Sequence, residues 1–272
     1  MEQTGPGKSA NNTTPHEGDR VKRSRTATAL ASVLVTGALC LTGCHTISST
    51  GSPTQGPPTQ RSATQGSAPA GQDAAGGSAE AALDRLPVHA AGTMSGYNRL
   101  AFGAAWTDNT GDVDGHNGCD TRDDILALYL TQITYRSGHC TVATGTLQDP
   151  YTGRTIHFVR GPKSTVIQID HVVALGNAWT SGASQLTATQ RQDLAEDPLE
   201  LLAVDGPTNE AKGDGDASQW LPPQAGYHCA YVARQVAVKT KYHLWVTSAE
   251  KTAMQHVLTT CPKQGLPVEP KP

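Results

Sequence analysis

The sequence predicts an α+β fold, and two kinds of local pattern carry this prediction. Hydroxyl residues followed three positions later by Gln or Glu, as at Thr187 and Thr247, are typical of helix N-termini. Short β-branched and apolar runs favour extended strands. These runs cover residues 140–147, 155–159, 166–173 and 198–204. The first two runs flank a turn signal at 149–153 and are therefore expected to pair as a hairpin.

The first 44 residues have the pattern of an export signal. A basic cluster at 20–25 precedes an uncharged, apolar run at 26–41, which is the order found in signal peptides. That run is shorter than the roughly 20 residues that a membrane span requires. Residues 41–44 resemble the bacterial lipobox, in which the final cysteine becomes the lipidated first residue of the mature protein. We therefore expect a lipoprotein anchored through Cys44 to the extracellular face of the cell membrane, with a plain secretory signal as the alternative.

Composition divides the rest of the chain into three parts. Residues 45–82 consist mainly of Gly, Ser, Pro, Thr, Gln and Ala and are expected to form a disordered tether, because they cannot bury enough apolar surface to fold. Residues 83–262 are long enough for one domain with an adequate core. Residues 263–272 are expected to form a polar tail. We expect the domain to be a monomer.

Cysteine usage is consistent with export. Of the six cysteines, one lies in the apolar run and one is Cys44. The remaining four are an even number in an exported domain, which suggests two disulfides. Three pairings are open; Cys119–Cys140 and Cys229–Cys261 are favoured because each is local to its own half of the domain. A zinc site built from these cysteines is the alternative, although no Cys-x-x-Cys spacing occurs.

Two ionisable residues, Asp170 and His171, stand near the end of the apolar run at 166–173. A strand can hold such a pair rigidly as a metal ligand and a base; the alternative is a salt-bridged histidine at a strand end. A small-residue loop at 176–184 and a short helix follow, then the strand at 198–204. A helix beginning near 207 then carries Asn209 and Lys212. The order is therefore strand, excursion, strand, helix.

This arrangement resembles the ββα-metal core of HNH nucleases. More closely, the stretch from about 119 to 261 is similar to HNH-family proteins related to the domain of unknown function 1524, which also occurs at the C-terminus of GmrSD-type restriction enzymes. The motifs that carry the resemblance stand at 119–122, 149–153, 170–173, 209–214 and 220–223. The resemblance implies an HNH core embedded in a single domain with additional helices and a hairpin.

The resemblance also implies roles for individual residues. His171 stands at the position of the general base that activates water. Asp170 and Asn209 stand at the metal-binding positions, and their oxygen atoms favour Mg²⁺, with Mn²⁺ or Zn²⁺ as alternatives. Lys212, one helical turn after Asn209, is expected to contact phosphate. Glu200 replaces the central asparagine of the motif and could accept a hydrogen bond from His171, add a metal ligand or weaken the site.

Charge alone identifies no substrate. The net charge of −3 does not predict general affinity for nucleic acid, but a local basic cleft would suffice for a nuclease. Arg154 and Arg160 form a basic cluster near the hairpin and are candidates for phosphate contacts, with solubilising surface charge as the alternative. The sequence therefore predicts an exported, metal-dependent HNH endonuclease acting on DNA, with RNA as a further substrate. The alternative is a catalytically inactive HNH-fold protein that binds nucleic acid or acts as an envelope interaction lipoprotein.

Overall fold

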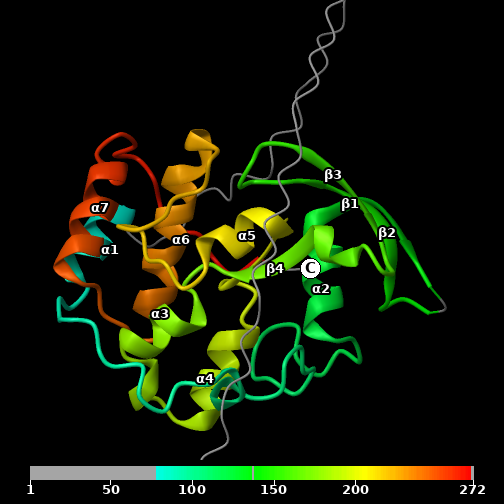
Figure 1. The fold of residues 1–272 in the computed structure, drawn as a ribbon, viewed down its shortest axis with the longest axis horizontal. Helices are drawn as coiled ribbons and strands as arrows, with labels where there is room; N and C mark the ends of the chain where they lie inside the picture. The colour runs from blue at the N-terminus through cyan, green and yellow to red at the C-terminus, as the bar shows by residue number, and fades with distance from the viewer. Residues whose placement is uncertain (1–77, 137, 271–272) are drawn as a thin grey trace, which may run out of the picture. The chain divides into compact units, whose positions relative to one another are not determined.

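The computed structural model describes residues 78–136 and 138–270 (Figure 1). The expected signal peptide, Cys44 and nearly all of the expected tether lie outside the described residues. Helix α1 (Ala79–Arg85) begins four residues before the expected domain boundary at residue 83, and its Ala79, Ala82 and Leu83 side chains are buried. None of the helices in these two ranges is long and apolar enough to cross a membrane.

The C-terminal segment is also part of the fold. The backbone N–H of Ala79 donates to the carbonyl of Gln264 at 2.8 Å, and Leu266 packs against the main hydrophobic core. The residues after 262, expected to be a polar tail, therefore pair with the start of α1. This contact brings the two ends of the domain together.

The domain combines helices with two small antiparallel sheets, so the predicted α+β fold class is confirmed. The first sheet is antiparallel, with strand order β1-β2-β3. Its strands are β1 (Leu130–Tyr135), β2 (Val142–Gln148) and β3 (Thr155–Val159). The expected hairpin is β2–β3. Strand β1 was not predicted, and α2 (Thr121–Tyr129) leads directly into it, with Asp120 accepting a hydrogen bond from the backbone of Asp123 as N-cap.

The second sheet is the two-stranded unit that carries the Asp-His pair. Strand β4 (Ile167–His171) pairs antiparallel with β5 (Leu201–Asp205), so that Asp170 lies opposite Leu202. Helix α5 (Gly206–Lys212) follows β5 immediately, with Asp205 as its N-cap. Together β4, β5 and α5 form a ββα unit.

The excursion between β4 and β5 is largely helical. It contains α3 (Leu175–Thr180), η3 (Ala183–Gln185) and α4 (Ala188–Glu196). The expectation of a loop at 176–184 was therefore wrong for its first part: Leu175, Ala178 and Trp179 are buried, and this burial stabilises a helix that the small residues alone do not favour. The capping box at Thr187 is confirmed at the start of α4.

Two long helices complete the domain. They are α6 (His228–Lys241) and α7 (Ser248–Leu258), and the capping box of Thr247 with Glu250 is confirmed at the start of α7. The remaining short helices are η1 (Arg99–Phe102), η2 (Ser164–Val166) and η4 (Ala225–Tyr227).

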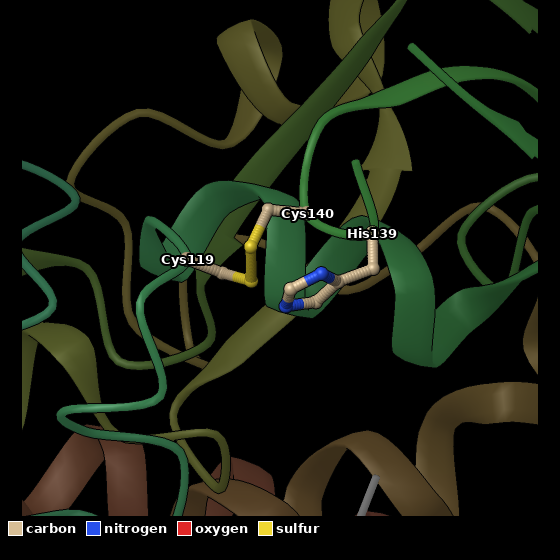
Figure 2. A group of neighbouring side chains, drawn as sticks. All are labelled: Cys119, His139 and Cys140. Carbon is tan, nitrogen blue, oxygen red and sulfur yellow. A yellow bond between two sulfur atoms is a disulfide. The ribbon is translucent and has the colours of Figure 1, made fainter. Parts of the chain in front are cut away.

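Two disulfides join the cysteine pairs that the sequence favoured, Cys119–Cys140 and Cys229–Cys261. Figure 2 shows the first bridge, with His139 beside it. The second bridge joins the start of α6 to the segment after α7. Because these sulfur atoms are bonded to each other, they offer no thiolate for a metal ion.

Strand β5 separates two hydrophobic cores. Leu201 and Ala203 pack with α2 and the three-stranded sheet, whereas Leu202 and Val204 pack with the helical core. This alternation follows from the two-residue period of a strand, and it buries all five residues of β5. In Figure 1, β4 and α5 accordingly lie between the three-stranded sheet and the helices α1, α6 and α7. The site at the end of β4 is therefore supported from both sides.

Candidate active site

The Asp-His pair borders a cavity of about 220 Å³. Because side chains alternate along a strand, Asp170 and His171 leave β4 on opposite faces and reach the cavity at the strand's end. The cavity brings Asp170 and His171 together with Asn209 from α5. Its full lining is Arg99, Ile169, Asp170, His171, Ala174, Leu175, Asn209, Gly213 and Asp214.

His171 is held in one orientation by its neighbours. Its Nε2 lies 2.9 Å from the carbonyl oxygen of Ala195, near the end of α4. A carbonyl can only accept, so Nε2 carries the proton, and the neutral ring keeps its lone pair on Nδ1. The indole of Trp106 stacks on the imidazole with ring centroids 6.3 Å apart. The backbone N–H of Trp106 donates to Glu196 at 2.9 Å, which ties the stacking residue to the same helix end.

The protonation state of His171 follows from its environment. Burial, the largest cause, and the positive charge of Arg99 together lower the pKa of His171 to about 3. The imidazole is therefore neutral across the physiological pH range, which is the state in which Nδ1 can accept a proton.

The negative charge of Asp170 is balanced by a buried lysine of the same domain. Nζ of Lys212 lies 2.8 Å from Oδ1 and 3.0 Å from Oδ2 of Asp170, and 2.6 Å from the carbonyl oxygen of His171. The Lys212 side chain is fully buried, so in this structure it faces Asp170 rather than a phosphate in solvent. The hydroxyl of Tyr151 donates to Oδ2 of the same carboxylate. Burial and the charge of Asp170 raise the pKa of Tyr151 well above its ordinary value, so this hydroxyl keeps its proton.

Asn209 is oriented by a chain of amide hydrogen bonds. Its Nδ2 donates to Oε1 of Gln168 at 2.9 Å, and Nε2 of Gln168 donates in turn to Glu210 at 2.8 Å. Since the amide nitrogen of Asn209 is engaged, its oxygen Oδ1 is the atom left to bind a cation.

Glu200 lies near the pair but does not contact the imidazole. Its carboxyl group is fully buried, and both oxygens lie 3.2 Å from the backbone N–H of Val173. Burial raises the pKa of Glu200 well above its ordinary value. The structure thus places Glu200 as a support for the segment that follows His171.

The two arginines of the basic cluster lie outside the cavity lining. Arg154 forms an ion pair with Asp205 at 3.0 Å, and Arg160 forms one with Asp123. Both cations are therefore already paired with carboxylates.

Four residues of the site were not assigned a role from the sequence: Arg99, Trp106, Tyr151 and Asp214. Tyr151 and Asp214 lie within recognised motifs, which is a usable signal. Asp214 approaches the start of α3 because residue 176 is glycine: a Cβ there would lie 2.5 Å from Cγ of Asp214. Arg99 and Trp106 precede the motifs, and no local pattern marks them.

The oxygen atoms at the cavity suit a hard divalent cation. Lys212 and Tyr151 occupy three of the roughly four lone-pair directions of the Asp170 carboxylate, which leaves one for an ion. With Oδ1 of Asn209 and the carboxylate of Asp214, the donors are all oxygen. Mg²⁺ is commonly held by one or two carboxylates with water completing its shell, so the residues present fit this ion.

Within the described ranges, two groups of three or more His, Cys, Asp or Glu residues lie close enough together to hold a metal ion. One is the disulfide pair with His139 (Figure 2), and the other consists of Asp112, Asp197 and Glu269. The second group surrounds Nζ of Lys241. Neither group shares a residue with the cavity.

Comparison with known proteins identifies the family. The model of the C-terminal domain of GmrSD restriction endonucleases matches residues 120–257. The chain belongs to this family. An uncharacterized secreted protein of Arthroderma benhamiae is 37% identical over 186 residues, which cover 68% of this chain and 85% of the relative. The GmrSD C-terminal domain family is a nuclease family, and its match includes the whole ββα unit, whereas η1 with Arg99 precedes it.

Proposed function

We propose that this chain is an exported, metal-dependent HNH-type endonuclease that hydrolyses phosphodiester bonds of nucleic acid, with DNA as the expected substrate and RNA as a further one. The observation that carries the proposal is the 2.9 Å contact between Nε2 of His171 and the Ala195 carbonyl, which assigns the proton to Nε2 and the lone pair to Nδ1, at a cavity shared with Asp170 and Asn209. Membership of a nuclease family supports it.

In the proposed reaction, Nδ1 of His171 accepts a proton from a water molecule while the water oxygen bonds to phosphorus. The bond from phosphorus to the leaving oxygen breaks, and that oxygen takes a proton from solvent. Ala195 and Trp106 keep the imidazole in position. A divalent cation held by Asp170 and Asn209 would supply charge stabilisation for the phosphate and the leaving oxygen.

The test is cleavage of supercoiled plasmid by the purified protein with Mg²⁺ or Mn²⁺. The His171→Ala protein should lose about 10²-fold or more in rate, because it lacks the base. His157→Ala is a matched control, since His157 is an exposed histidine on β3. Absence of cleavage by the wild type with either ion, or equal cleavage by His171→Ala, would refute the proposal. Glu200→Asn in the same assay measures how far position 200 limits the rate.

A second function, binding of nucleic acid without cleavage, is favoured by one observation. Lys212 already neutralises Asp170, which weakens the attraction of this carboxylate for a metal ion. Under this alternative the protein binds DNA in a salt-dependent manner, and the same plasmid stays intact with every divalent ion.

The proposed location is the extracellular face of the cell membrane, with Cys44 carrying a lipid. The two disulfides and the secreted relative support export. Cells fed a labelled fatty acid should label the wild-type protein but not Cys44→Ser, which should appear in the medium. Equal labelling of both would contradict the anchor.

A further inference from the structure

The segment before the family domain places one more side chain at the cavity. Arg99 is the first residue of η1, and the family match begins only at residue 120. Arg99 lines the same cavity as Asp170, His171 and Asn209. Arg99 is exposed to solvent. This segment therefore contributes to a site whose other polar groups come from the family domain.

Helix η1 is fixed in place by packing and hydrogen bonds. Phe102 is buried, and its ring lies 6.2 Å from that of Trp179. Oδ1 of Asn98 accepts from the backbone N–H of Ala101 at 3.0 Å, and Nε of Arg191 donates to the Ala101 carbonyl at 2.7 Å. Arg99 thus projects from a supported element, which is what a precise binding contact requires.

Arg99 differs from the other cations considered for phosphate binding. Lys212, Arg154 and Arg160 are each paired with a carboxylate. In the part of the chain that the structure describes, no carboxylate lies within ion-pair distance of the Arg99 guanidinium, and its side chain donates no hydrogen bond. An unpaired arginine can bind two phosphate oxygens through its planar fork.

We propose that Arg99 is a binding residue that holds a phosphate of the nucleic acid beside His171. The N-terminal segment then completes a binding site that the family domain leaves without an available cation. The inference rests on the proposed function for its substrate class, a phosphodiester anion, but it can be tested by binding alone.

The experiment measures binding of a fluorescent DNA oligonucleotide to the purified His171→Ala protein in EDTA, so that neither cleavage nor metal contributes. Adding Arg99→Ala should weaken binding about tenfold and lower the slope of log K against log salt by about one. Arg99→Lys should restore the salt slope but only part of the affinity, because an ammonium cannot bind through a fork.

Arg136→Ala is the charge-matched control, since Arg136 is also exposed and forms no ion pair among the described residues. It should leave affinity within about twofold, and thermal unfolding should show all variants folded. Equal binding by the Arg99→Ala and Arg136→Ala proteins, or no binding by the parent at low salt, would overturn the inference. If binding depends on Arg99 while the wild type cleaves nothing, the inference stands and the nuclease proposal fails.

Discussion

Lys212 and Lys239 are both fully buried lysines paired with a carboxylate, but they lie in different surroundings. Nζ of Lys239 lies 2.9 Å from Glu250, 3.2 Å from Oδ1 of Asn177 and 3.1 Å from a backbone carbonyl. Both side chains of this pair are closed off from solvent. In contrast, the Asp170 carboxylate beside Lys212 lines the cavity. The Lys239–Glu250 pair joins α6 to α7, whereas the Lys212–Asp170 pair balances charge at the candidate site.

The two environments differ in what can neutralise the carboxylate once its lysine is removed. A charge left alone in a closed core has no substitute partner, so it must be neutralised by a proton or the fold must open. A carboxylate that borders a cavity can instead be reached by water or by a metal ion. The two pairs should therefore respond differently to the loss of the lysine and to added Mg²⁺.

The largest expected effect is at the enclosed pair. Lys239→Met should lower the free energy of unfolding by about 3–5 kcal/mol, because it leaves Glu250 buried and unpaired. Urea denaturation measures this, with the exposed Lys263→Met as control. The double variant Lys239→Met/Glu250→Gln should recover part of the loss, since both charges are removed and Gln can still form the capping box with Thr247. A loss below about 1 kcal/mol in the single variant would show that the pair contributes little.

A smaller effect is expected at the cavity. Lys212→Met should cost about 1–3 kcal/mol, because water at the cavity can hydrate Asp170. Mg²⁺ should then raise the melting temperature of Lys212→Met more than that of the wild type, as an ion binds the freed carboxylate and Asn209; saturation at 100 times Kd corresponds to about 2.7 kcal/mol. Mg²⁺ should not rescue Lys239→Met. Equal shifts in both variants would mean that the ion acts nonspecifically.

Those parts of the fold that have local signals were predictable from the sequence. The capping boxes at Thr187 and Thr247 mark helix starts through hydrogen bonds within four residues, and the β2–β3 hairpin is marked by its turn. Strand β1 escaped prediction because most of its side chains are polar or exposed. Helix α3 escaped because the burial of Trp179, a tertiary effect, stabilises it.

The candidate site also contains some residues that a sequence motif marks and others that no local pattern marks. Asp170, His171 and Asn209 were proposed because a motif orders them along the chain, and all three line one cavity. Lys212 was predicted to contact phosphate, but sequence spacing carries no information about burial, and the side chain is buried against Asp170. Arg99 precedes His171 by a long stretch of chain, so only tertiary packing reveals it.

The smallest expected effect concerns a third cluster, in which one lysine forms ion pairs with three carboxylates. Nζ of Lys241 lies 3.5 Å from Asp112 and 2.8 Å from Asp197, and it also pairs with Glu269. Oδ2 of Asp112 is buried without a hydrogen-bond partner among the described residues. Burial and the nearby negative charge of Asp197 raise the pKa of Asp112 to about 7. In the ranges that the structure describes, Lys212 is paired with Asp170 alone, whereas Asp112 shares Lys241 with Asp197 and Glu269.

Because the folded pKa of Asp112 exceeds the unfolded value, the folded state binds the extra proton between about pH 4 and 7. Stability should therefore fall as the pH rises through this window. Asp112→Asn should leave stability nearly unchanged at pH 4 and increase it by up to about 1 kcal/mol at pH 8, after screening at a partly exposed cluster. Urea denaturation across this range measures it. A destabilised Asp112→Asn at pH 8 would mean that Lys241 keeps Asp112 charged.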